Sequence, residues 1–192
     1  MLRPLEDPTE NVFVTQVETG GTTLVTVGLN RAPANAVSYP PVMSANGHVV
    51  AYGSKATNLV AHDEHSGTAA FVTDWTTGVT QLVSSGVDGV VANGDTWVYG
   101  ISADGRKVAF TSAATNLVAG GTNDKWNAFV RNMATGATTL VSVGVGGAQA
   151  NGACSWVAMS ADGRWVGFQS NATNMVTGVN TQNGVYIRGP LS

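Results

Sequence analysis

Residues 102–112 read Ser-Ala-Asp-Gly-Arg-Lys-Val-Ala-Phe-Thr-Ser, and residues 160–170 read Ser-Ala-Asp-Gly-Arg-Trp-Val-Gly-Phe-Gln-Ser. The related Ser-Ala-Asn-Gly at 44–47 precedes the first segment by the same interval that separates the two segments. Self-similarity at a fixed interval marks a repeat architecture. The chain is therefore built of 58-residue repeats, and a second motif, Ala-Thr-Asn-Leu/Met-Val, keeps the interval at residues 56–60, 114–118 and 172–176.

Each repeat contains four short apolar runs, which lie in one copy at residues 97–102, 107–112, 128–131 and 138–143. Valine, threonine and aromatic residues dominate the runs, and these residue types favour β-strands. Asp104-Gly105 separates the first two runs and is typical of a tight hairpin turn, since glycine accepts the positive φ that such turns need. No run has the apolar spacing of an amphipathic helix. The sequence therefore predicts an all-β protein of four-stranded antiparallel sheets.

Four-stranded units that recur along a chain at intervals of roughly 40–60 residues are typical of β-propeller blades. The segments at 102–112 and 160–170, the Ala-Thr-Asn-Leu-Val motif and the hairpin at 129–136 resemble TolB-like β-propeller repeats, which are WD-repeat-like blades. The resemblance extends across residues 11–190 and implies a β-propeller of about three blades per chain. It does not imply one function, because propellers serve many roles.

The strands of one repeat, labelled A to D in chain order, divide the chain into unequal parts. We expect residues 39–96 and 97–154 to form two complete blades. A closed propeller usually needs at least four blades, so we expect two chains to complete one another. The remaining parts are then an N-terminal tail (1–10) and a partial propeller (11–192) that begins with strands C and D of a shared blade (11–38) and ends with its strands A to C (155–192).

This division predicts a homo-oligomer, with a homodimer that forms one six-bladed ring as the simplest case. Strand exchange between chains would also cover exposed sheet edges, which otherwise invite aggregation. Residues 11–16 and 185–188 compete for the same C position of the shared blade. The sequence Gly189-Pro190 predicts that 185–188 is the weaker of the two strands, because proline disfavours continued pairing.

The repeat also predicts the core. Phe13, Phe71 and Phe129 are expected at equivalent strand-C positions, with Tyr186 in the last copy, which is one residue shorter. Strand B is expected to contribute aromatic side chains that pack between blades, namely Tyr52, Phe110 and Phe168.

The composition excludes several classes of protein. The formal net charge is −3 and charged residues are 11% of the chain, against about 25% in ordinary soluble domains. We therefore expect no nucleic-acid binding, because there is no basic excess to neutralise phosphates. We expect no membrane insertion either, because no apolar run is long enough. The low charge favours an extracellular or cell-surface setting, although residues 1–8 contain no signal peptide.

Two loops contain candidate metal ligands. His62-Asp63-Glu64-His65 could bind a divalent cation, although a polar surface loop is the more ordinary interpretation. In TolB-like repeats the same loop often presents aspartates suited to calcium, which prefers carboxylate and carbonyl oxygens. Here the candidate Ca²⁺ ligands are Asn123, Asp124 and Asn127. Gly121 and Asn127 replace two of the expected carboxylates and Lys125 adds positive charge, so a loop held by side-chain to backbone hydrogen bonds is the alternative.

Tryptophans supply the candidate ligand-binding residues. Trp75 and Trp126 lie at or near loops, where aromatic rings can stack on the faces of sugars. Trp97, Trp156 and Trp165 lie on strands A and B, where packing between blades explains them.

Catalytic motifs are missing from the sequence: it has no nucleophile elbow, phosphate loop or dinucleotide fingerprint. Asp104 and Asp162 fill equivalent turn positions, and the single cysteine, Cys154, precedes a strand. We therefore expect no catalytic residue, no bound organic cofactor, and a non-catalytic propeller module that acts through oligomeric assembly and binding of a carbohydrate or protein ligand. The alternatives are a lectin-like carbohydrate-binding propeller, a structural subunit of an extracellular filament, and an enzyme.

Overall fold

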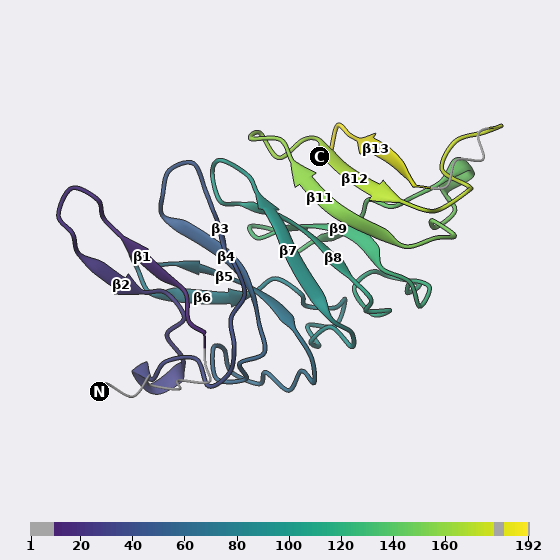
Figure 1. The fold of residues 1–192 in the computed structure, drawn as a ribbon. Helices are drawn as coiled ribbons and strands as arrows, with labels where there is room; N and C mark the ends of the chain where they lie inside the picture. The colour runs from purple at the N-terminus through teal and green to yellow at the C-terminus, as the bar shows by residue number, and fades with distance from the viewer. Residues whose placement is uncertain (1–9, 179–182, 192) are drawn as a thin grey trace, which may run out of the picture.

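The computed structural model describes residues 10–178 and 183–191, and its strands form four antiparallel sheets that follow one another along the chain (Figure 1). The sheets contain, in chain order, β1 (Phe13–Thr15) and β2 (Thr22–Leu24); β3 (Val42–Met43), β4 (Val49–Ser54), β5 (Ala69–Asp74) and β6 (Val79–Leu82); β7 (Thr96–Ile101), β8 (Lys107–Ser112), β9 (Asn127–Asn132) and β10 (Thr138–Leu140); and β11 (Cys154–Met159), β12 (Val166–Ser170) and β13 (Gly184–Arg188). Two short 3₁₀ turns, η1 (Leu29–Arg31) and η2 (Val145–Gly147), follow β2 and β10.

The two central sheets are complete blades, each with four strands in meander order. The turn between β7 and β8 shows why the repeated Ser-Ala-Asp-Gly motif produces a hairpin. Ser102 Oγ donates to Asp104 Oδ1 at 2.6 Å, the same carboxylate oxygen accepts the Arg106 N–H at 3.0 Å, and Gly105 has φ of 74°. Ser160 and Asp162 form the same pair in the last sheet. The predicted all-β fold with four-stranded antiparallel sheets is confirmed.

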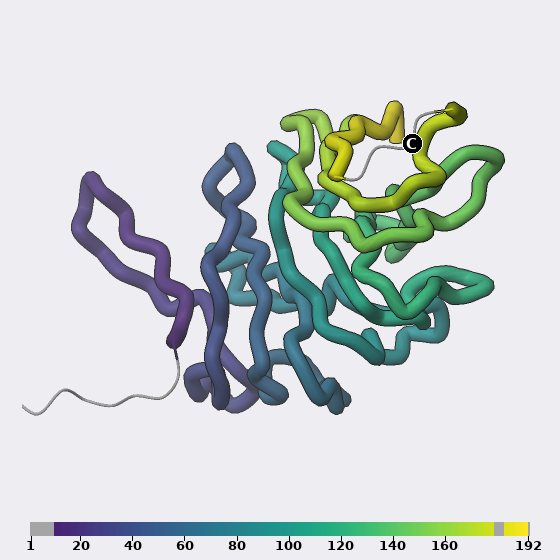
Figure 2. Tube along the Cα trace, turned by 45° about the vertical axis from the view of Figure 1, so that its right-hand side comes forward, coloured from purple at the N-terminus to yellow at the C-terminus, as the bar shows by residue number. Residues whose placement is uncertain are grey.

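The hydrophobic core lies between successive sheets. Phe71, Phe110, Phe129 and Tyr52 are fully buried, and Phe168 is nearly so. The side chains of one sheet pack against the facing side chains of the next, as in the cluster that joins Ala109, Ala128 and Val130 to strands of the last sheet. The N-terminal hairpin stands at one end of this array, and β13 is in the sheet at the other end (Figure 2).

A polar latch, formed by an asparagine before strand A and a threonine after strand B, recurs in the three sheets that follow the N-terminal hairpin. Asn93 Nδ2 donates to Thr115 Oγ1 at 2.8 Å, and the Thr115 N–H donates to Asn93 Oδ1 at 2.8 Å. The same pair of bonds joins Asn35 to Thr57 and Asn151 to Thr173. The same side chains therefore hold loops of the same geometry in successive repeats.

Burial at the end sheets differs from the predicted core, although Phe13 holds the strand-C position equivalent to that of Phe129. Phe13 is 58% exposed, because the sheet formed by β1 and β2 has no strand B beside it within the described residues. Trp165 is 45% exposed, and among the described residues no further sheet packs on the last one. Trp156 is 73% exposed, but its ring lies 6.4 Å from the ring of Tyr99 on the preceding blade, as expected for packing between blades. β13 pairs with β12 at five positions and β1 pairs with β2 at three, and which of the two takes the C position of a shared blade stays a prediction. Trp97 packs edge-to-face on Tyr39 of the preceding blade, as expected.

Candidate functional site

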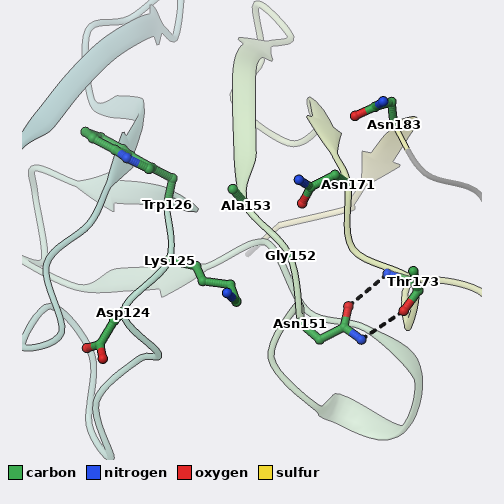
Figure 3. Close-up of a pocket in the computed structure, with 9 residues that line it drawn as sticks. All are labelled: Asp124, Lys125, Trp126, Asn151, Gly152, Ala153, Asn171, Thr173 and Asn183. Carbon is green, nitrogen blue, oxygen red and sulfur yellow. Dashed lines mark hydrogen bonds between the residues drawn. The ribbon is translucent and has the colours of Figure 1, made fainter.

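The predicted ligand and metal residues after β8 lie beside a pocket of about 600 Å³ between the second complete blade and the last sheet. Asp124, Lys125 and Trp126 border it on one side, and the segment Asn151–Ala153 borders it on another. Asn171 and Asn183 complete the polar lining (Figure 3). The pocket therefore forms where the loop between strands B and C of one blade meets the next sheet.

The repeat offers an internal comparison for this pocket. The equivalent groove between the two complete blades measures about 170 Å³, and Gly67, Thr68 and Asp95 border it. It lies next to a further pocket of about 570 Å³, bordered by His65, Ser66 and Asn93. In the first groove Asp95 Oδ1 accepts the Thr68 N–H at 2.7 Å, so the carboxylate fills the groove. Ala153 occupies the position of Asp95 in the next repeat, so no carboxylate enters the second groove at this point.

The two predicted ligand-binding tryptophans have different surroundings. Trp75 is half-buried, packs against the core of the first complete blade and donates from Nε1 to the Gly47 carbonyl at 2.6 Å. Trp126 borders the pocket, but its ring points away from Asn171 and Asn183, whereas the Lys125 side chain extends toward Asn151 (Figure 3). The backbone of Trp126 is structural, since its carbonyl accepts the Cys154 N–H at 2.7 Å.

The three predicted calcium ligands differ in their burial and in their hydrogen-bond partners. Asn127 is buried; its Nδ2 donates to Asn123 Oδ1 at 2.8 Å, and its Oδ1 accepts the Ser142 hydroxyl at 2.9 Å. Asn123 Nδ2 donates to the Ala150 carbonyl at 2.8 Å, while Asp124 is exposed. These amides hold the loop by the hydrogen bonds of the alternative interpretation, and calcium binding stays a prediction.

The other candidate metal loop contains a buried pair. His65 Nδ1 contacts Asp63 Oδ1, and the remaining side-chain atoms of the pair, Asp63 Oδ2 and His65 Nε2, are buried without a hydrogen-bond partner among the described residues. Within the part of the chain that the structure describes, no group of three or more His, Cys, Asp or Glu residues is placed to hold a metal. The pair therefore occupies the interior of the loop and does not form a cluster of ligands.

The acids and the cysteine have structural surroundings. The Ser102 hydroxyl lowers the pKa of Asp104 by hydrogen bonding to its carboxylate, and Ser160 does the same to Asp162. Cys154 is 3% exposed, and burial raises the pKa of its thiol. A high pKa and poor access both oppose nucleophilic reactivity.

Apolar side chains on strands at both ends of the array are exposed. Val185 and Ile187 on β13 are 79% and 73% exposed, and Phe13 on β1 is 58% exposed. The sequence predicted strands at these positions but did not predict that these side chains are exposed. Asn171, Asn183 and Lys125 were also missed as pocket residues, although the change from Asp95 to Ala153 within the repeat is a signal that could have found the pocket.

No protein-family model matches the chain, and no curated protein sequence matches it. Among solved structures it is similar to TolB from Acinetobacter baumannii, at 16% identity and a TM-score of 0.48, with 95% of this chain covered. It is also similar to a structure from a study of two prolyl endopeptidases, at 12% identity and a TM-score of 0.55, with 94% of this chain covered. Membrane-spanning helices are not found among residues 10–178 and 183–191.

A third similar structure is the β-propeller domain of the Trilobed protease from Pyrococcus furiosus, at 14% identity, a TM-score of 0.44 and 82% coverage of this chain. The chain spans 38% of the TolB chain, 24% of the prolyl endopeptidase chain and 45% of the Trilobed protease domain. At these identities the likeness concerns the fold. The strand order and the match above a TM-score of 0.5 define a β-propeller, and the predicted fold class is confirmed. The chain supplies two complete blades and parts of two others.

Proposed function

We propose that this protein is a non-catalytic β-propeller module that works through assembly, in which a second copy covers its open blade faces. The observation that carries the proposal is a comparison between equivalent residues of β9 and β13. Ala128 and Val130 of β9 are 0% and 4% exposed because the last sheet covers them, whereas Val185 and Ile187 of β13 are 79% and 73% exposed. The same apolar face is therefore buried in one repeat and open in the next.

The other end of the array supports the same proposal. Phe129 packs on the preceding blade and is fully buried, whereas the equivalent Phe13 is 58% exposed. Burial of a valine, isoleucine or phenylalanine side chain stabilises by about 1.5–3 kcal/mol. Two junctions between two copies would each bury the Val185 and Ile187 face of one β13, so a closed pair gains this stabilisation twice.

Charged substitutions on the exposed face of β13 test the assembly. We expect the double variant Val185→Asp/Ile187→Asp to halve the mass measured by light scattering, because a junction that buries two carboxylates is strongly disfavoured. The matched control is Val17→Asp, since Val17 is 95% exposed in the turn between β1 and β2. If the double variant keeps the mass of the unsubstituted protein, this face is not an interface. A mass far above that of a dimer in the unsubstituted protein would indicate open head-to-tail contacts and a filament.

A second candidate function is carbohydrate binding in the pocket between the second complete blade and the last sheet. It is favoured by the exposed amides of Asn171 and Asn183 and by the Lys125 ammonium, which can hydrogen-bond sugar hydroxyls around a pocket of about 600 Å³. A glycan array should then show binding that Lys125→Ala and Asn171→Ala both weaken. Lys55→Ala, an exposed lysine away from this pocket, is the control. Absence of any glycan signal would contradict this function and leave the assembly intact.

A further inference from the structure

The second strand of the chain has the sequence of a blade's outer strand. Residues 22–24 read Thr-Thr-Leu, as do residues 138–140 of β10. The likeness continues beyond the strands, because residues 21–28 (Gly-Thr-Thr-Leu-Val-Thr-Val-Gly) match residues 137–144 (Ala-Thr-Thr-Leu-Val-Ser-Val-Gly) at six of eight positions. A strand C of the kind that pairs with β10, such as β9, is therefore suited to pair with β2.

In the second complete blade an arginine binds this outer strand. Arg131 lies on β9 opposite Thr138, and its guanidinium donates to Thr138 Oγ1 at 2.9 Å. The same guanidinium nitrogen donates to the Ser85 carbonyl of the preceding repeat at 3.2 Å. Arg131 thus ties three elements together: strand C, strand D and the preceding blade.

Arg188 on β13 holds the position of Arg131 in the last sheet. It donates to the carbonyl of Val143, which is the residue equivalent to Ser85 in the next repeat. Among the described residues β13 has β12 as its only strand neighbour, so the place of strand D beside it is open. Arg188 therefore reproduces the contact of Arg131 with the preceding blade. The other contact of Arg131, with a threonine of strand D, has no counterpart among the described residues of this sheet.

We infer that this place is taken by β2 of a second copy, an inference that rests on the proposed assembly and specifies its junction. The register follows from the β9–β10 ladder, in which Phe129, Val130 and Arg131 face Leu140, Thr139 and Thr138. Transferred to the junction, Tyr186 faces Leu24 of the second copy, Ile187 faces Thr23 and Arg188 faces Thr22. Arg188 then donates to the Thr22 hydroxyl as Arg131 does to Thr138.

The exchange requires β1 to leave β2, and β13 offers an equivalent replacement. β1 is held by three ladder positions and by a hydrogen bond of 2.9 Å between the Thr15 and Thr22 hydroxyls. The preceding Val12 is 5% exposed against the first complete blade; its N–H donates to the Thr26 hydroxyl and its carbonyl accepts the Val25 N–H, so all of these contacts must be exchanged. In the junction Val185 and Ile187 occupy the positions of Val12 and Val14, so their exposed side chains become buried. β11, β12 and β13 of one copy then form a four-stranded blade with β2 of the other, in place of the two-stranded sheet of β1 and β2.

Cysteine pairing between copies tests the register. Directly opposite residues on antiparallel strands have Cβ atoms about 4.5–5.5 Å apart, close enough for a disulfide after a small adjustment. A size-tagged Thr23→Cys variant is mixed with an untagged Ile187→Cys variant and oxidised, so that only a bond between copies gives the mixed dimer on a non-reducing gel. Cys154 is buried and present in both, and Val17→Cys mixed with Ile187→Cys is the control.

We expect the mixed dimer to form several-fold more from Thr23→Cys with Ile187→Cys than from the control pair. Light scattering of the unsubstituted protein accompanies the gel. A dimer by mass with no excess of the mixed product would overturn this strand exchange and leave the proposed assembly standing. A monomer by mass would overturn both.

Discussion

The ring of Phe110 stacks on the ring of Phe129 across β8 and β9, with centroids 5.5 Å apart and an angle of 18° between the planes. Both side chains are fully buried. Tyr52 and Phe71 form the same pair in the preceding blade, with centroids 6.0 Å apart. The aromatic pair thus recurs in both complete blades, where it joins strands B and C and faces the neighbouring blade.

Truncation of an aromatic side chain of this kind should lower the free energy of unfolding strongly where a neighbouring blade covers it, and only slightly where no blade does. We expect Phe110→Ala and Phe129→Ala each to lower the free energy of unfolding by about 3–5 kcal/mol, because each leaves a cavity in a dry core. Phe13→Ala should cost far less in a sample diluted to separate chains, since this side chain is 58% exposed. Urea denaturation measures all three, and equal losses would contradict the assignment of the core.

The polar latch between Asn93 and Thr115 should contribute measurably although it is exposed. Asn93→Ala removes two hydrogen bonds of 2.8 Å and leaves the Thr115 N–H without its partner. At about 0.5–1.5 kcal/mol for each bond, the loss should be roughly 1–3 kcal/mol. Asp88→Ala, a substitution in a nearby exposed loop, is the control. Equal midpoints for the two variants would show that the repeated asparagine has no structural role.

Tyr52 should make stability depend on pH at the alkaline end. Burial raises the pKa of Tyr52 from 10.0 to about 12, more than its hydrogen bond with Thr73 lowers it. Because the folded state holds the proton more tightly, the stabilisation is complete below pH 10 and is lost as the pH rises toward 12. The loss should be on the order of 2–3 kcal/mol. Denaturation at pH 8 and pH 11.5 should show a smaller alkaline loss for Tyr52→Phe than for the unsubstituted protein, and equal losses would refute the assignment.

The repeat in the sequence predicts most of the fold, since each hairpin is specified locally. Strand B at residues 107–112 has the predicted limits, because the Ser102–Asp104 turn fixes where β8 begins. Burial at the ends of the array is not local. Phe13 and Phe129 have the same place in the repeat, and only the number of neighbouring blades decides which one is exposed.

The candidate sites were less predictable, because they depend on which partner a side chain finds across the blade boundary. The sequence proposed Asn123 and Asn127 as ligands without showing that each amide is bonded to neighbouring loop groups. It proposed Trp126 without showing where its ring points. The change from Asp95 to Ala153 is visible in the repeat, but its effect on the size of the groove is seen only in three dimensions.

The central claim is that a second copy covers the open blade faces, and the mass of the particle in solution tests it most directly. Multi-angle light scattering across a hundredfold dilution should give about twice the chain mass of 19.7 kDa at high concentration and approach the chain mass on dilution. The melting temperature should fall over the same range, because assembly stabilises the folded chain. The mass of a single chain at every concentration, with a cooperative melt that does not change on dilution, would contradict the account.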